Sequence, residues 1–124
     1  MIGTGSEVGI CIEAAKILSG EGIKTRVVSM PCQDIFFEQS QEYQLSILPG
    51  NVATLSVEAS SVYGWHRLSH AQIGMTRFGK SGSGGDLFKY FGFSTDNVVD
   101  KAKKMVEYYK EVGSVPNLMS RPTF

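Results

Sequence analysis

Residues 3–18, with the sequence GTGSEVGICIEAAKIL, and residues 23–31, IKTRVVSMP, decide the fold of this 124-residue chain. The paired glycines at the start permit backbone angles that a side chain would penalise, so they predict a tight turn. Thr4 and Glu7 have the spacing of a capping box, which predicts that Thr4 caps a helix. A turn that leads directly into a helix is typical of the exit from a buried strand in an α/β protein.

The helix that follows this turn carries an apolar face. The apolar residues of this face recur at helical spacing and are Val8, Cys11, Ala15 and Leu18. Ile12 is expected to widen the face. Gly20 and Gly22 predict the end of the helix, because glycine is common just after the last helical turn. The run Val27, Val28 and Met30 then predicts a second strand that is covered on both faces.

The rest of the chain continues this alternation of helices and strands. Helices are expected over 34–39, 40–48, 62–68, 86–91 and 96–112, and strands over 52–57 and 72–76. Ser94 is the expected N-cap of the last helix, and 114–124 is expected to be an extended tail. The pattern predicts an α/β fold, a three-layer helix–sheet–helix arrangement with a mostly parallel sheet. No linker divides the chain, so residues 1–124 are expected to form a single domain.

Composition limits the classes of function. Hydrophobic residues make up 42% and charged residues 19% of the chain, as in ordinary soluble domains. The 12 basic and 12 acidic residues cancel, which argues against nucleic acid or a membrane surface as a partner. No apolar run approaches the roughly 20 residues needed to span a bilayer, and no secretory leader is evident. The two cysteines are expected to be reduced thiols, and the protein is expected to be cytoplasmic.

Six segments, in this order and at these spacings, resemble the C-terminal domain of transketolases. They are GTGSE at 3–7, VSMP at 28–31, SILP at 46–49, VEA at 57–59 with GW at 64–65, IGM at 73–75 with FGKS at 78–81, and LFKYFGF at 87–93. The chain departs from the family twice. Gly82-Ser83-Gly84-Gly85 replaces the usual Ala-Pro after the serine, and only Met1 and Ile2 remain of a first strand that normally begins earlier.

The resemblance implies a parent enzyme, several hundred residues longer, that transfers a two-carbon ketol unit between sugar phosphates. Such enzymes use thiamine diphosphate and a divalent metal, Mg or Ca, held in preceding domains and across the dimer interface. The resemblance therefore implies no catalytic, cofactor-binding or metal-binding residue in this chain, which is expected to be inactive alone. It implies a structural or dimerisation domain, whose partners are the remaining domains and the homodimer mate. Dihydroxyacetone synthase is a second candidate parent, but the ending RPTF at 121–124 is not a peroxisomal Ser-Lys-Leu address.

Two alternatives stay open beside the structural role. One is a docking domain for a partner, as the equivalent domain serves in some oxo-acid dehydrogenases. The other is a small-anion regulatory site at the carboxyl edge of the sheet, where α/β proteins bind ligands. Its candidate residues are Thr4, Gly5, Ser6, Glu58, Lys80 and Ser81. Against it, Glu7 and Asp86 would repel an anion, and Glu58 is expected instead to cap the following turn or to pair with an arginine such as Arg77.

Other residues point to structure rather than chemistry. His66 and His70 are four apart, the spacing of a metal pair, but they lack a third ligand nearby and are expected to be solvated. Trp65 and Tyr63 are candidates for a subunit interface, where aromatic residues are enriched. The remaining aromatic pairs lack neighbouring clusters of basic residues, so core or interface packing is expected instead of base stacking.

Overall fold

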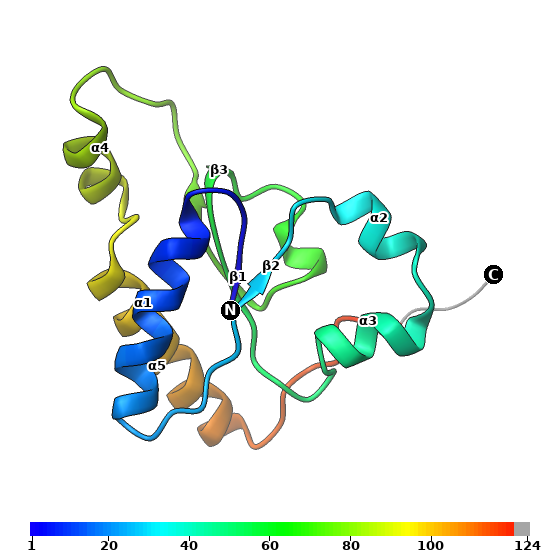
Figure 1. Cartoon of the computed structure of the whole chain (residues 1–124). Coiled ribbons are helices and arrows are strands. Elements are labelled where there is room, and N and C mark those ends of the chain that lie inside the picture. The colour runs from blue at the N-terminus through cyan, green and yellow to red at the C-terminus, as the bar shows by residue number, and fades with distance from the viewer. Residues whose placement is uncertain (121–124) are drawn as a thin grey trace.

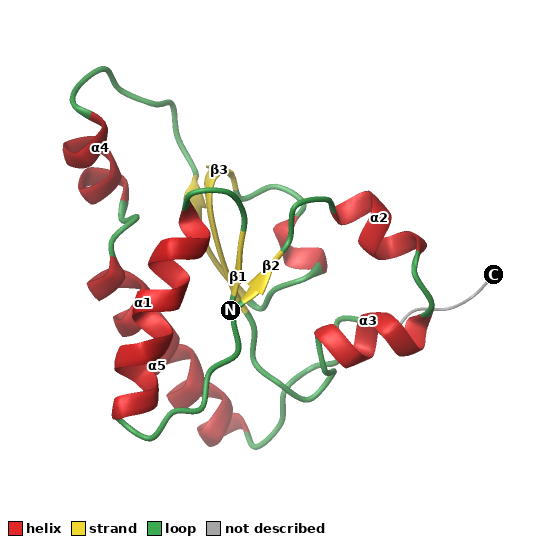
Figure 2. Ribbon diagram, in the orientation of Figure 1, coloured by secondary structure: helices red, strands yellow, loops and turns green. Residues whose placement is uncertain are grey.

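The computed structural model describes residues 1–120, and 121–124, including the end of the expected tail and the RPTF ending, lie outside the described part. Four parallel strands form one sheet in the order β2-β1-β3-β4, with helices on both faces (Figures 1 and 2). The elements in chain order are β1 Ile2–Gly3, α1 Glu7–Gly20, β2 Val28–Ser29, α2 Gln33–Glu38, α3 Gln41–Ile47, β3 Leu55–Ser61, the short 3-10 helix η1 Trp65–Arg67, β4 Ala71–Met75, α4 Gly84–Phe91 and α5 Thr95–Val112. The expected three-layer α/β fold is confirmed.

The beginning of α1 differs from the expected capping box. Ser6 is the residue before the helix, it has helical backbone angles, and its side chain makes no capping hydrogen bond. Thr4 lies two residues before this position, too early to cap the helix, and its hydroxyl donates instead to Glu58. The end of α1 does follow the prediction, because Gly22 adopts φ +83° and Ile23 N–H donates to the Leu18 carbonyl at 2.9 Å.

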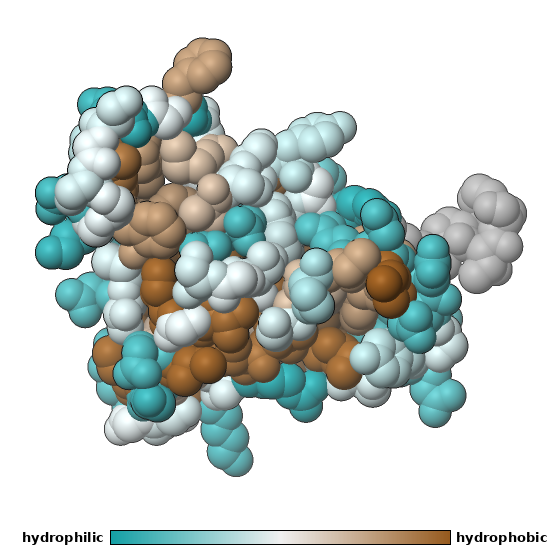
Figure 3. Space-filling model, turned by 45° about the horizontal axis from the view of Figure 1, so that its top comes forward, coloured by the Kyte–Doolittle hydropathy of each residue, from teal (hydrophilic) through white to brown (hydrophobic). Residues whose placement is uncertain are grey.

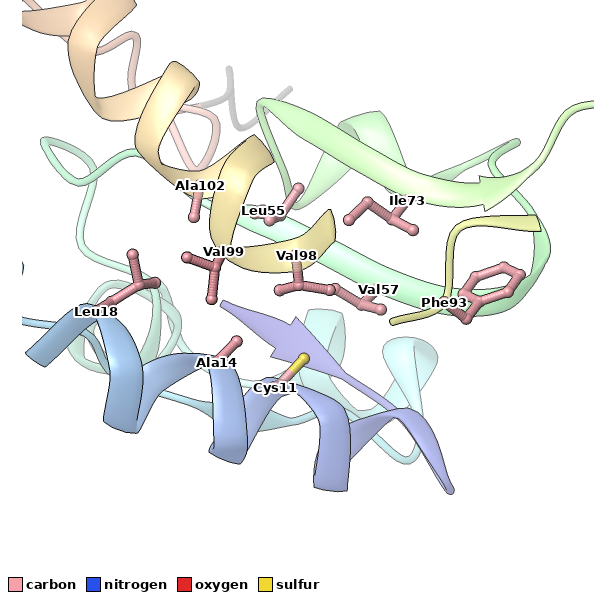
Figure 4. Packing of buried hydrophobic residues seen from close by; sticks show 10 residues of the cluster. All are labelled: Cys11, Ala14, Leu18, Leu55, Val57, Ile73, Phe93, Val98, Val99 and Ala102. Atoms are coloured by element: carbon pink, nitrogen blue, oxygen red, sulfur yellow. The ribbon is translucent and has the colours of Figure 1, made fainter. Parts of the chain in front are cut away.

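One hydrophobic core lies between the sheet and helices α1 and α5. Side chains from both helices meet those of β3 and β4 there, and Phe93 joins them from the connection between α4 and α5 (Figure 4). The buried members are Cys11, Ala14, Leu18, Leu55, Val57, Ile73, Phe93, Val98, Val99 and Ala102. Burying a leucine or valine side chain of this kind contributes roughly 1.5–3 kcal/mol. Ile12 is 42% exposed, so the expected widening of the apolar stripe of α1 is wrong. The N-cap of α5 is confirmed, because the Ser94 hydroxyl accepts from Asn97 N–H at 3.3 Å.

A second core covers the opposite face of the sheet. It is formed by Ile2, Met30, Phe36, Leu48, Trp65, Leu68 and Met119, which come from β1, the α2–α3 region, η1 and the tail. Met119 thus packs the tail against this core, and residues 114–120 form no helix or strand. Trp65 is buried in this core, so its expected place at a surface interface is wrong, whereas Tyr63 is exposed.

Two elements between 52 and 68 differ from the expectation. The strand expected over 52–57 runs instead over Leu55–Ser61, and it stays paired with β4 as far as Ser61 and Met75. The helix expected over 62–68 is reduced to the three residues of η1. Gly64 has φ +89°, outside the helical region, so a continuous helix cannot pass through it.

Candidate functional site

Thr4 and Glu58 meet at the carboxyl edge of the sheet. Thr4 follows β1 and Glu58 lies within β3, and because these strands are neighbours the Thr4 hydroxyl donates to Glu58 Oε2 at 2.7 Å. Both side chains are half-buried. They line a hollow of about 630 Å³ whose other members include Gln33, Ser60 and Tyr63. Arg77 lies over the rings of Tyr90 and Phe91, so the predicted ion pair between Glu58 and Arg77 is wrong.

Glu7 is a second carboxylate at this edge, where its spacing in the sequence predicted only a capping box with Thr4 and no contact with β3. It is 3% exposed. Its Oε1 accepts from the Ser6 hydroxyl at 2.6 Å, and its Oε2 accepts from Ala59 N–H at 3.4 Å. The N-terminal end of α1 also favours a negative charge at this position. Glu7 thus ties the start of α1 to β3, and the only sequence signal for it was an acid in the first helical turn.

The structure does not bring the predicted residues of the anion site together. Thr4 and Glu58 are together, and Gly5 and Ser6 are exposed on the turn beside them. Lys80 and Ser81 are not part of the lining of the hollow and lie on the connection between β4 and α4. The hydroxyls of Thr4 and Ser6 are already engaged by carboxylates, and the charge of Glu58 opposes a bound anion.

Lys80 instead joins a group of aromatic rings. Its Nζ lies 4.4 Å from the centroid of the Tyr90 ring, and the Arg77 guanidinium carbon lies 4.8 Å from the same centroid. Tyr90 packs edge-on against Phe91 at 5.0 Å. Hydrogen bonding from Lys80, with a smaller contribution from the charge of Arg77, lowers the pKa of Tyr90. The sequence did not reveal this cluster, because Arg77 and Tyr90 are 13 positions apart and belong to different elements.

His70 has a structural position that contradicts the expectation of a solvated ring. Its Nδ1 accepts from Thr54 N–H at 3.0 Å, and its Nε2 donates to the Pro116 carbonyl at 2.8 Å. These partners require a neutral ring with its proton on Nε2, because a carbonyl can only accept. The ring also packs edge-on against Tyr109. His66 is exposed, and within residues 1–120 no three His, Cys, Asp or Glu side chains are grouped so that they could hold a metal ion.

The two cysteines are unpaired, as expected for reduced thiols. Cys32 is exposed and Cys11 is buried in the core under α1. Burial raises the pKa of Cys11 from 9.0 to about 11, so this thiol stays protonated near neutral pH. Within residues 1–120, no helix combines the length and the apolar character that crossing a membrane requires.

Comparisons with known proteins give a consistent result. A family model described as "Transketolase-like TK C-terminal domain" matches residues 1–94. The transketolase of Scheffersomyces stipitis is 47% identical over 120 residues, which are 97% of this chain and 18% of that protein. The structure of Pichia stipitis transketolase in complex with sedoheptulose-7-phosphate superposes with a TM-score of 0.90 at 46% identity, over 99% of this chain and 18% of that one. The structure of the transketolase of Leishmania mexicana superposes with a TM-score of 0.88 at 41% identity, over 94% of this chain and 17% of that one. The chain thus spans less than a fifth of the length of these relatives.

Proposed function

Because this chain belongs to the family of transketolase-like C-terminal domains, we propose that it is a non-catalytic structural domain of a transketolase. The observation that carries the proposal is the match of 97% of this chain to 18% of the length of a transketolase. In the proposed parent, the transfer of a two-carbon ketol unit between sugar phosphates takes place outside this domain.

Within residues 1–120, the side chains at the carboxyl edge of the sheet do not fit the cofactor that the family implies. Thiamine diphosphate with a divalent metal needs oxygen or nitrogen ligands for the metal and donors for a diphosphate. At the carboxyl edge of the sheet, the buried Glu7 and the half-buried Glu58 oppose a diphosphate, and their neighbouring hydroxyls already donate to them. We therefore assign the cofactor and its metal to the other parts of the parent enzyme.

The proposed role of the domain is to present a rigid surface to the rest of the enzyme. The buried Glu7 and the Thr4–Glu58 hydrogen bond join α1 and β1 to β3, and the two cores fix the helices on both faces. Its proposed partners are the remaining domains of the parent and a second copy of the enzyme. The unpaired cysteines agree with a reducing compartment, and we place the parent in the cytoplasm.

The proposal is tested by exchanging domains. In the chimera, this chain replaces the C-terminal domain of the Scheffersomyces stipitis transketolase, to which it is 47% identical. Ketol transfer from a ketose phosphate to an aldose phosphate is measured with thiamine diphosphate and Mg²⁺ for the chimera, the intact enzyme and the isolated chain. The chimera is expected to transfer the ketol unit, and the isolated chain is not. Turnover by the isolated chain, or a chimera that folds but lacks activity, contradicts the proposal.

A further inference from the structure

The connection between β4 and α4 exposes a large aromatic side chain. All residues from 76 to 86 are exposed, and Phe78 is 98% exposed. In Figure 1 this segment leaves the sheet and rises away from it before it turns into α4. In the space-filling view the same corner of the molecule, at the upper left, projects from the body of the domain (Figure 3). An exposed phenylalanine contributes no burial to the stability of this domain, so its apolar ring is available for contact with another surface.

A second exposed aromatic residue shares a hollow with Phe78. Tyr63, between β3 and η1, is 89% exposed. Both rings line a hollow of about 750 Å³, whose lining also includes Val62 and Met75. Aromatic residues around an apolar hollow are the kind of residue that anchors protein interfaces.

The charge of this surface is positive. The lining of the hollow contains the guanidinium of Arg77 and no carboxylate. Lys80 lies beyond Phe78, and both Lys80 and Arg77 are held against the Tyr90 ring. Because these cations are ordered by a ring of the same domain, less conformational entropy is lost when a partner binds them.

We propose that the docking surface formed by Tyr63, His66, Arg77, Phe78 and Lys80 binds the rest of the transketolase chain, through an apolar pocket bordered by carboxylates. The proposal rests on the proposed function, which leaves more than four fifths of the parent chain outside this domain. A symmetric contact with a second copy of the same surface is disfavoured, because it would bring Arg77 and Lys80 near their own copies and like charges across an interface repel.

The test compares hydrogen–deuterium exchange in the isolated chain and in the chimera. Amides 76–83 are expected to exchange rapidly in the isolated chain and to be protected in the chimera. Phe78→Ala and Arg77→Glu are each expected to reduce that protection by about tenfold, as loss of one interface anchor does. The matched control is Ile35→Ala, which removes another well-exposed apolar side chain on α2 and is expected to leave protection unchanged. None of the three variants should alter the melting temperature of the isolated chain, because these side chains lie on its surface.

The outcomes separate the two proposals. Protection that is lost in Phe78→Ala supports the docking surface, whatever the rate of ketol transfer. A chimera that transfers the ketol unit while amides 76–83 remain unprotected overturns the docking surface and leaves the proposed function standing. If neither Phe78→Ala nor Arg77→Glu reduces the protection of amides 76–83, the docking surface is also overturned. A folded chimera with neither activity nor protection overturns both proposals.

Discussion

The hydroxyl of Thr4 donates a 2.7 Å hydrogen bond to the carboxylate of Glu58, and so joins the turn after β1 to β3 across 54 residues of sequence. A hydrogen bond to a charged acceptor contributes more than one between neutral groups, and this one is only half-buried. The bond therefore fixes the carboxyl edge of the sheet from within the domain.

Replacing Thr4 by valine is expected to lower the free energy of unfolding by about 1–2 kcal/mol, because Glu58 loses its donor. Urea denaturation followed by tryptophan fluorescence measures the change, since Trp65 is buried. Thr4→Ser keeps the hydroxyl and is the matched control. Equal losses in both variants would assign the effect to the methyl group of Thr4 and not to the hydrogen bond.

The buried carboxylate of Glu7 gives a second prediction. Glu7→Ala leaves Ala59 N–H without its acceptor, and is expected to cost about 1–3 kcal/mol of stability. Glu7→Gln keeps an oxygen that can accept from Ala59 N–H and an amide that can donate to the Ser6 hydroxyl. The loss of stability in this variant should therefore be smaller. Thermal unfolding of the two variants measures the difference. If glutamine is as destabilising as alanine, the charge at the start of α1 matters more than the hydrogen bond to β3.

The sequence predicted the fold better than it predicted the contacts at the carboxyl edge. Periodicity places α5 and its Ser94 cap correctly because both depend on local spacing. Thr4 and Glu58 were both expected at this edge, but the hydrogen bond between them was missed because local spacing made Glu7 look like the capping partner of Thr4. The cluster of Arg77, Lys80 and Tyr90 was missed for the same reason. The path of the chain around α4 brings these side chains together, and no spacing rule describes that path.

The Cys11 thiol gives a prediction about pH. Its pKa rises from 9.0 to about 11 on folding, so the folded state keeps a proton that the unfolded state loses. The contribution of Cys11 to stability is therefore fully present below pH 9 and declines as the pH rises from 9 towards 11. The measurement is the difference in free energy of unfolding between the native chain and Cys11→Ala, taken as a function of pH under reducing conditions. A difference that stays constant between pH 9 and pH 11 contradicts the raised pKa of Cys11 in the folded state.

The two thiols should also differ in reactivity. A thiol reagent at neutral pH is expected to label the exposed Cys32 rapidly and the buried, protonated Cys11 only when the core opens. In Cys32→Ser, labelling should therefore become slow, and it should accelerate with denaturant. Rapid labelling of Cys32→Ser without denaturant would show that the core under α1 is open to solvent.

His70 is predicted to hold the tail against the sheet. The ring accepts from Thr54 N–H before β3 and donates to the Pro116 carbonyl, so His70→Ala removes both connections at once. The expected result is faster hydrogen exchange or proteolysis over 114–120 and a stability loss of about 1–3 kcal/mol, since Met119 loses its place in the second core. His66→Ala is the matched control, because His66 is exposed and should be replaceable without effect. Unchanged exchange over 114–120 in His70→Ala would mean that the burial of Met119 alone holds the tail in place.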